Sequence, residues 1–235
     1  DACKIIRSLF MLRFINYTFL YFRYLIRLVM STRFVILDYG MGNLHSVERR
    51  FKRLNVNVLV TSSPKVLANA DKIILPGVGH FKKAMDNLSS MHLVDTLNEC
   101  VIGKKIPVLG ICLGMQIMAR YGEEGDCEGL DWFDAKVAKF DVSDYLKFKV
   151  PHIGWNQISI KKDSLLMKQI PDLSEFYFVH SYHFKSRLNT DVLNTTDYSY
   201  EFVSAVEKNN IFGVQYHPEK SHDIGDQLLM NFIAL

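Results

Sequence analysis

Several protein classes are marked by features that this 235-residue sequence has little of. It holds four cysteines, none in a Cys-x-x-Cys pair, which is too few for a disulfide framework, so we expect a reducing, cytoplasmic location. Thirteen glycines and six prolines exclude a collagen-like or low-complexity chain, and 49% apolar residues exclude a disordered one. The length suits one domain with a well-buried core.

The excess of positive charge is small and unevenly distributed. The chain has 28 Lys and Arg against 25 Asp and Glu, a net charge of +3. Residues 1–33 hold six basic groups and one acidic group, so the remainder holds 22 basic and 24 acidic groups and has a net charge of −2. This slightly acidic body has no basic field to neutralise a phosphate backbone, so we expect no nucleic-acid binding.

The first thirty residues match neither a signal peptide nor a typical membrane span. Residues 9–29 are apolar and aromatic but contain three dispersed arginines, each costing roughly 2.5–3.5 kcal/mol near a bilayer centre. They also lack an uninterrupted apolar stretch followed by a cleavage site. We expect residues 1–31 to be an N-terminal extension outside the fold and residues 32–235 to form the domain. A basic amphipathic surface anchor and a true membrane span are the alternatives.

From Met30 onward, apolar runs alternate with helix-period segments, which is typical of an α/β domain. The first half predicts strands and helices in turn, at 34–37, 44–54, 57–60, 72–75, 81–88, 93–102 and 107–111. After residue 122, strands follow one another before a closing helix, at 135–140, 157–160, 176–179, 183–187, 202–207, 212–215 and 224–233. We predict an open, mixed, mainly parallel sheet flanked by helices, with an added antiparallel layer on the same domain.

The strongest chemical signal is Gly-Ile-Cys-Leu-Gly at residues 110–114, where a predicted strand meets a helix. Gly-x-nucleophile-x-Gly is typical of a nucleophile elbow, a strained turn in which flanking side chains would collide with the neighbouring strand and helix. A thiol at a helix N-terminus is favoured as the reactive thiolate. We therefore predict Cys112 as a nucleophile. A buried structural cysteine is the alternative, and we favour it for Cys3, Cys100 and Cys127.

A base for this thiol follows the predicted strand 212–215. Open α/β sheets place their sites at the carboxyl ends of strands, so His217 can reach Cys112 there. Glu219, two residues further on, can hold the imidazole in one tautomer, and Pro218 restricts the backbone between them. We predict a Cys-His-Glu arrangement.

A second loop at a strand end is Pro76-Gly77-Val78-Gly79. Its glycines allow backbone N–H groups to approach a substrate closely. An ordinary turn is the alternative interpretation.

Together these motifs resemble the class I, triad-type glutamine amidotransferases, over about residues 32–235. The resemblance implies a flavodoxin-like core. It becomes closer, and similar to the glutaminase subunits of histidine biosynthesis, with four further segments: Asp38–Asn43 (DYGMGN), Pro151–Asn156 (PHIGWN), Tyr177–Tyr182 (YFVHSY) and Gly213–Ser221 (GVQYHPEKS).

The resemblance implies a role for each matched residue. Cys112 would attack the side-chain carbonyl of L-glutamine, His217 would move the proton, and Glu219 would orient His217. The backbone N–H groups of Val78 and Leu113 would form the oxyanion hole. The residues implied to hold glutamine are Gly77, Gly79, Gln116, Ser181 and Tyr182. The resemblance implies no cofactor and no metal.

The same resemblance implies a protein partner. In the family, the ammonia passes to a cyclase subunit with a (β/α)8 barrel, so we expect a cytoplasmic heterodimer, with no membrane contact by the main domain. The residues expected to face the partner are Asn43, Trp155, Asn156 and Lys220. An ordinary core or surface aromatic is the alternative for Trp155.

Other functions stay open beside histidine biosynthesis. Residues 129–137 and 221–223 look more like a paralogous group that supplies ammonia for sugar amidination in surface-polysaccharide synthesis. A non-catalytic partner-binding module is opposed by the intact Cys112, His217 and Glu219. A peptide hydrolase with the same elbow is opposed by Gln116 and the His-Ser-Tyr segment, through resemblance alone.

Overall fold

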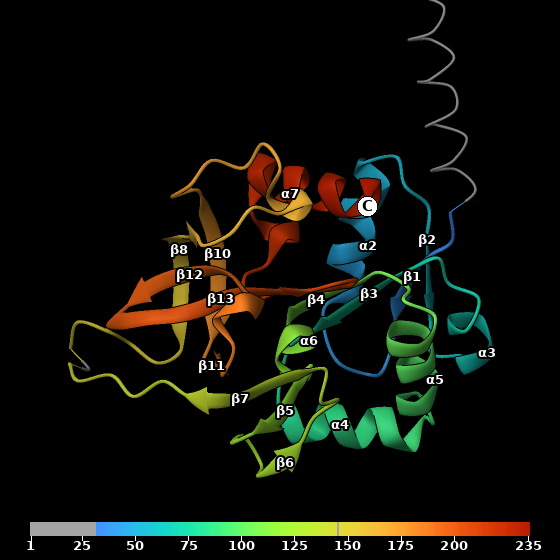
Figure 1. Ribbon diagram of the computed structural model, residues 1–235, viewed down its shortest axis with the longest axis horizontal. Helices are drawn as coiled ribbons and strands as arrows, with labels where there is room; N and C mark the ends of the chain where they lie inside the picture. The colour runs from blue at the N-terminus through green and yellow to red at the C-terminus, as the bar shows by residue number, and fades with distance from the viewer. Residues whose placement is uncertain (1–31, 145) are drawn as a thin grey trace, which may run out of the picture. The chain divides into compact units, whose positions relative to one another are not determined.

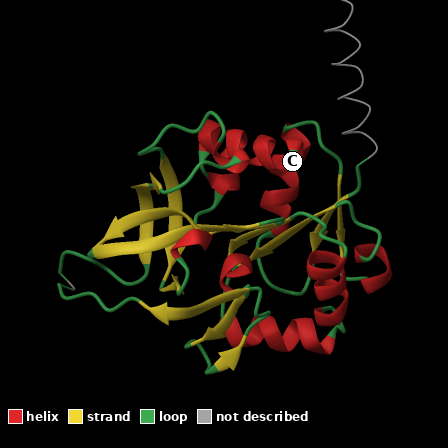
Figure 2. Ribbon diagram, viewed as in Figure 1, coloured by secondary structure: helices red, strands yellow, loops and turns green. Residues whose placement is uncertain are grey.

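The predicted strands form one large mixed sheet whose parallel part contains the Gly-x-Cys-x-Gly strand. The computed structural model describes residues 32–144 and 146–235 (Figures 1 and 2). Residues Arg33–Leu235 form one compact unit. The expected N-terminal extension, residues 1–31, lies outside the described residues and stays a prediction.

The parallel part of the sheet has helices on both faces. Its strands lie in the order β2 (Val58–Thr61), β1 (Phe34–Leu37), β3 (Lys72–Gly77), β4 (Val108–Cys112) and β14 (Ile211–Val214). All residues of β1, β3, β4 and β14 are buried, because helices cover both faces of these strands. This burial explains why the strands are nearly continuous apolar runs in the sequence. This confirms the predicted α/β core.

Beyond β14 the same sheet continues with mostly antiparallel pairing. The strands that follow are β13 (Tyr200–Lys208), β11 (Tyr182–Ser186), β7 (Phe133–Lys139), β5 (Ala119–Gly122) and β6 (Cys127–Glu128), while β12 (Val192–Tyr198) pairs with β13 and β9 (Ser159–Ile160) with β12. A separate antiparallel pair is formed by β8 (His152–Gln157) and β10 (Glu175–His180). The predicted antiparallel addition is confirmed.

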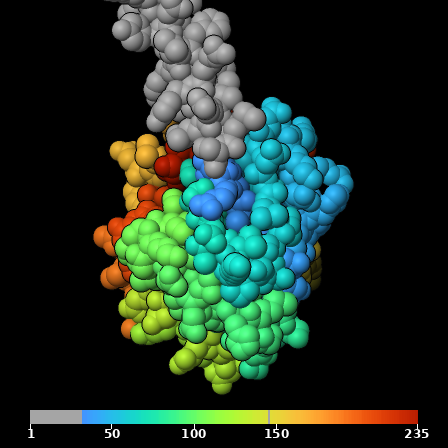
Figure 3. All heavy atoms as spheres, turned by 90° about the vertical axis from the view of Figure 1, so that its right-hand side faces the viewer, coloured from blue at the N-terminus to red at the C-terminus, as the bar shows by residue number. Residues whose placement is uncertain are grey.

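Helices α2 and α7 cover one face of the parallel strands, and α4 and α5 cover the other (Figure 1). Seen from the β2 edge, the surface is formed mostly by the first half of the chain (Figure 3). The described helices are α2 (Leu44–Arg53), α3 (Pro64–Leu67), α4 (Phe81–Ser90), α5 (Val94–Asn98), α6 (Leu113–Gln116) and α7 (His222–Ala234), with a π-helical turn at Glu99–Gly103 and 3-10 turns at Leu165–Met167, Asn189–Asp191 and Pro218–Lys220. Among the described residues, no helix combines the length and apolarity needed to cross a membrane.

The sequence missed four strands: β5, β6, β8 and β12. Strand β12 escapes prediction because its centre is polar, with Asn194, Thr195 and Thr196 buried. These side chains have hydrogen-bond partners on the adjacent strand β13; the Ser204 hydroxyl, for example, donates to Asn194 Oδ1 at 2.8 Å. The helix predicted over 93–102 is interrupted, since α5 passes into the π-helical turn at Glu99.

Candidate active site

The predicted nucleophile elbow is formed at the junction of β4 and α6. Cys112 has φ +55° and ψ −111°, a backbone conformation that side-chain-bearing residues rarely adopt. A Cβ atom at Gly114 would lie 1.7 Å from the Leu75 carbonyl oxygen, and one at Gly110 would lie 2.7 Å from the Gly114 carbonyl oxygen. Both glycines are therefore required by the close approach of β3, β4 and α6, as the motif predicts.

Parallel pairing brings the base to the nucleophile. Strand β14 pairs with β4, so that Val214 lies beside Ile111, and the chain reaches His217 three residues later. His217 Nδ1 lies 2.8 Å from Glu219 Oε1, and both side chains are 3% exposed. Nε2 of His217 is buried and, among the described residues, bonds to no nitrogen or oxygen atom, so that Cys112 is its neighbour. Nδ1 therefore fixes the orientation of the ring through Glu219, and Nε2 is available to exchange a proton.

The charge state of His217 depends on Cys112. Burial alone would lower the pKa of this imidazole, but the charge of Cys112 and its hydrogen bonding, followed by the Glu219 carboxylate, outweigh burial and raise the pKa of His217 to about 10. The imidazolium is therefore the prevailing form at neutral pH. An imidazolium beside a thiolate can attack a carbonyl and then give its proton to a leaving group.

A cavity of about 400 Å³ opens above Cys112. The predicted residues that line it are Val78, Gly79, Cys112, Leu113, Gln116, Ser181, Tyr182 and Lys220. Val78 is 39% exposed at the rim, and Leu113 is the first residue of α6. The two proposed oxyanion donors therefore flank the nucleophile, from the loop after β3 and from the helix N-terminus.

Gln116 and Gly77, both predicted to contact glutamine, are buried in the structure. Gln116 is 4% exposed and its Nε2 donates to the Tyr182 carbonyl oxygen at 2.9 Å. Gly77 is paired with Cys112 across β3 and β4, and a Cβ there would lie 2.4 Å from the Tyr39 hydroxyl. Gly77 is not among the residues that line the cavity, and the described contacts give it a packing role.

Two of the expected partner-facing residues are grouped around Tyr177. Trp155 is 45% exposed, stacks on His222 at 5.0 Å and meets Tyr177 edge-on at 6.0 Å. The Lys220 ammonium lies 5.5 Å from the centre of the Tyr177 ring. Asn43 is exposed and caps α2 by accepting from the Ser46 N–H.

Asn156, the fourth expected partner-facing residue, makes three hydrogen bonds within the chain. Its Nδ2 donates to the Asp197 carbonyl oxygen and lies 3.3 Å from His152 Nε2, and its Oδ1 accepts from the Gln157 N–H. It is the most firmly held of the four side chains.

The sequence did not single out two residues at this site. Glu124 lines the cavity, and its carboxylate accepts a hydrogen bond from the Phe81 N–H at 2.7 Å. Gln215 is fully buried and its Nε2 donates to Cys112 Sγ at 3.5 Å. Gln215 stands two residues before His217 in the same GVQYHPEKS segment, and this nearness to the predicted base is the signal that could have found it.

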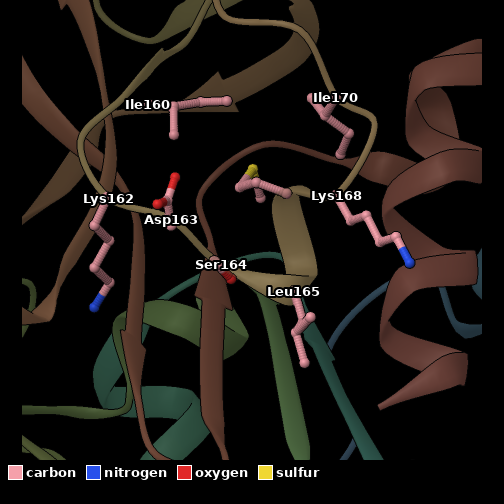
Figure 4. Close-up of a pocket in the computed structure, with 8 residues that line it drawn as sticks. Ile160, Lys162, Asp163, Ser164, Leu165, Lys168 and Ile170 are labelled. Atoms are coloured by element: carbon pink, nitrogen blue, oxygen red, sulfur yellow. The ribbon is translucent and has the colours of Figure 1, made fainter.

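A second hollow, of about 520 Å³, lies beside β9 and the turn at Leu165–Met167 (Figure 4). The ammonium groups of Lys162 and Lys168 extend to opposite sides, away from its centre. Lys162 Nζ is already bonded to the carbonyl oxygens of Thr190 and Glu207. This hollow contains none of the predicted site residues. In the described part of the chain, no three His, Cys, Asp or Glu residues are grouped to hold a metal ion.

Comparison with known proteins agrees with this geometry. The family model described as glutamine amidotransferase class-I matches residues 35–235. The fold is similar to a solved glutamine amidotransferase, with a TM-score of 0.66, 15% identity and coverage of 85% of this chain and 97% of that one. It is also similar to PurLQS from Thermotoga maritima, with a TM-score of 0.65, 15% identity and coverage of 87% and 99%. The chain therefore belongs to the class I glutamine amidotransferase family.

Individual members of this family that are similar to the chain indicate a narrower group. Imidazole glycerol phosphate synthase subunit HisH 2 of Methanococcus maripaludis is 45% identical over 198 residues, covering 84% of this chain and 97% of that protein. Subunit HisH of Pelagibacter ubique is 46% identical over 205 residues, with coverage of 85% and 98%. HisH 2 of Pseudomonas aeruginosa is 42% identical over 201 residues, with coverage of 86% and 98%. The resemblance to glutaminase subunits of histidine biosynthesis is confirmed.

Proposed function

We propose that this protein hydrolyses L-glutamine to L-glutamate and ammonia as the glutaminase subunit of imidazole glycerol phosphate synthase, in histidine biosynthesis. The observation that carries the proposal is the elbow cysteine beside a buried His217–Glu219 pair, in a chain 42–46% identical to HisH subunits. Because HisH is a subunit, the chain acts with a cyclase subunit in a heterodimer.

The first half of the reaction forms a covalent intermediate. The Cys112 thiolate attacks the side-chain amide carbon of glutamine, and the carbonyl oxygen gains negative charge. The N–H groups of Val78 and Leu113 stabilise that charge. The His217 imidazolium then gives its proton to the departing nitrogen, so that ammonia leaves and a γ-glutamyl thioester remains on Cys112.

The second half regenerates the enzyme. His217, now neutral, takes a proton from water, and the resulting hydroxide adds to the thioester carbon. The carbon–sulfur bond breaks, glutamate leaves, and Cys112 returns as a thiolate beside the His217 imidazolium. Glu219 holds the ring in one orientation through both steps, because its carboxylate accepts from Nδ1 at 2.8 Å.

The cavity suits the amino-acid end of glutamine. Glutamine carries an α-ammonium and an α-carboxylate at neutral pH, and Glu124 places a carboxylate in the cavity that can pair with the ammonium. Gly79, Ser181 and Tyr182 line the same cavity, and Gln116 holds the backbone of Tyr182. We assign the contacts to the α-amino acid portion to these residues.

We further propose that the partner is a (β/α)8-barrel cyclase that uses the ammonia to make imidazole glycerol phosphate and AICAR from PRFAR. Asn43, Trp155, Asn156 and Lys220 are the proposed contacts. The exposed Trp155 ring supports this assignment, because large aromatic side chains are enriched at the centres of protein interfaces. A cytoplasmic location fits Cys100, Cys112 and Cys127, which form no disulfide.

Growth without histidine tests the pathway. A cell that lacks its own glutaminase subunit, kept at low external ammonia, should grow without histidine when it carries this protein. The matched Cys112→Ala variant should not restore growth. Failure of the parent protein, when it is expressed and Cys112 is reactive towards alkylation, would favour the sugar-amidination alternative instead.

A further inference from the structure

Gln215 contacts the nucleophile directly. Its side chain is fully buried, and Nε2 donates to Cys112 Sγ at 3.5 Å. His217, two residues further along the chain, is also next to Cys112, which contributes charge and hydrogen bonding to its ring. Tyr216, between them, packs against Phe176. One short segment therefore delivers two side chains to the same sulfur.

The Gln215 amide has a single orientation. An amide presents an oxygen that accepts and an NH₂ group that donates, and a half-turn exchanges them. Gln116 Nε2 donates one hydrogen to the Tyr182 carbonyl oxygen, which can only accept, and the other to Gln215 Oε1 at 3.0 Å. Since Gln215 must present its oxygen to Gln116, its NH₂ group is directed at Cys112.

The Tyr182 carbonyl oxygen also accepts a hydrogen bond from the buried His180, which is itself bonded to a second buried histidine, His152. His180 Nδ1 donates to the carbonyl oxygen at 2.8 Å, and His152 Nδ1 lies 3.1 Å from His180 Nε2. Asn156 Nδ2 donates to the Asp197 carbonyl oxygen and so also presents its NH₂ group to His152 Nε2. The Tyr182 carbonyl at one end and the Asn156 NH₂ group at the other require the His180 and His152 rings to be neutral, each with its proton on Nδ1. A second proton on either ring would place two donors opposite each other.

We propose that Gln215 is a further catalytic residue, which stabilises the anionic sulfur of Cys112 with an N–H donor held in place by the Gln116–Tyr182–His180–His152–Asn156 hydrogen-bond chain. This inference rests on the proposed role of Cys112 as the nucleophile. The amide donor is present whether or not His217 is protonated. It therefore acts whenever the sulfur is anionic, before the attack on the substrate and again when the sulfur leaves the thioester.

Alkylation of Cys112 tests this role without glutamine. Iodoacetamide reacts with the thiolate, and peptide mass spectrometry reads the modification at Cys112 separately from the other cysteines. At pH 7 the variants Gln215→Leu and Gln215→Glu should react about 10-fold more slowly than the parent, since a hydrogen bond to a charged group has been removed. The control Asn194→Leu removes an equally buried amide that bonds Tyr216 instead, and should react at the parent rate.

A separate variant, Gln116→Leu, tests whether the orientation of the Gln215 amide matters. Gln116→Leu does not touch the sulfur, yet it frees the Gln215 amide to turn, so it should also slow alkylation. Parent-like alkylation of folded Gln215→Leu and Gln215→Glu, within a factor of about two, would overturn the proposal.

If both Gln215 variants fail to fold, the side-chain N–H signal of Gln215 decides the matter by NMR. It should lose a downfield shift in Cys112→Ala, whereas the Asn194 signal should stay; no change at Gln215 would overturn the proposal. Slow alkylation of the Gln215 variants, in a protein that releases no glutamate, would support Gln215 and reject the proposed reaction. The two hypotheses therefore fail separately.

Discussion

His217 Nδ1 lies 2.8 Å from Glu219 Oε1, and each of these side chains is 3% exposed. Glu219 lies in the short turn at Pro218–Lys220, and His217 directly precedes that turn, three residues after the end of β14. Burial of both groups would be costly if either stood alone, and the contact offsets that cost. This segment thus carries a preformed base whose second nitrogen is left for Cys112.

Removal of the Cys112 charge should lower the pKa of His217. In the parent this pKa is raised to about 10 because Cys112 and Glu219 outweigh burial. In Cys112→Ala only Glu219 opposes burial, so the titration of His217, followed by NMR of its ring, should move to lower pH. An unchanged titration would show that Cys112 does not act on this ring.

The same shift affects stability at high pH. The folded-state pKa of His217 lies above the unfolded value of 6.5, so its stabilising contribution is complete below pH 6.5 and is lost as the pH rises through about 10. Unfolding by urea at several pH values should show the parent losing stability over this interval. His217→Gln should lose less.

Gly114→Ala should destabilise the fold, because the new Cβ would lie 1.7 Å from the Leu75 carbonyl oxygen and force β3 and α6 apart. We expect a loss of about 3 kcal/mol or more in the free energy of unfolding. The matched control is Gly103→Ala, whose Cβ would lie 3.9 Å from Glu99 Cγ, an ordinary van der Waals contact. Equal stability of the two variants in urea titrations would contradict the packing account.

Glu124→Gln should raise the KM for glutamine by about 10-fold or more, since a charge-assisted contact to the α-ammonium is removed. Alkylation of Cys112 by iodoacetamide, a neutral reagent, should not change. The matched control is Glu123→Gln, because Glu123 is exposed and bonds Lys136 and Lys139 instead. A KM effect of the same size in both variants would remove Glu124 from the substrate site.

His152 should make the fold sensitive to acid. Burial lowers the pKa of His152 to about 4, below the unfolded value of 6.5. The stability that this lowered pKa confers is therefore fully present above pH 6.5 and is lost as the pH falls to about 4, by about 3 kcal/mol. His152→Phe should show a shallower loss of unfolding free energy over this interval, and a slope equal to that of the parent would count against a neutral buried His152.

The elbow and the base could be predicted from sequence because both depend on short-range spacing. Gly110 and Gly114 are required by local crowding, and Glu219 reaches His217 within one turn. The parallel core also follows from its apolar runs, since β3 and β4 are buried throughout. These features need no knowledge of distant contacts.

The rest of the site depends on pairing between distant segments. His152 and His180 meet because β8 and β10 pair in a register that sets them opposite each other, and β8 was not predicted. Gln215 reaches Cys112 only because β14 lies beside β4. Glu124 faces the cavity from the turn after β5, another strand the sequence did not predict. The positions of His152, His180 and Glu124 leave no local pattern in the sequence, whereas Gln215 could have been found only through its nearness to His217.

Release of glutamate from glutamine, measured for the parent and for Cys112→Ala in the presence of the partner cyclase, tests the central claim most directly. The parent should release glutamate and ammonia in equal amounts. Cys112→Ala should fall by roughly 10³-fold or more, because no thioester can form. Equal glutamate release by the two proteins would contradict Cys112 as the nucleophile and with it the proposed function.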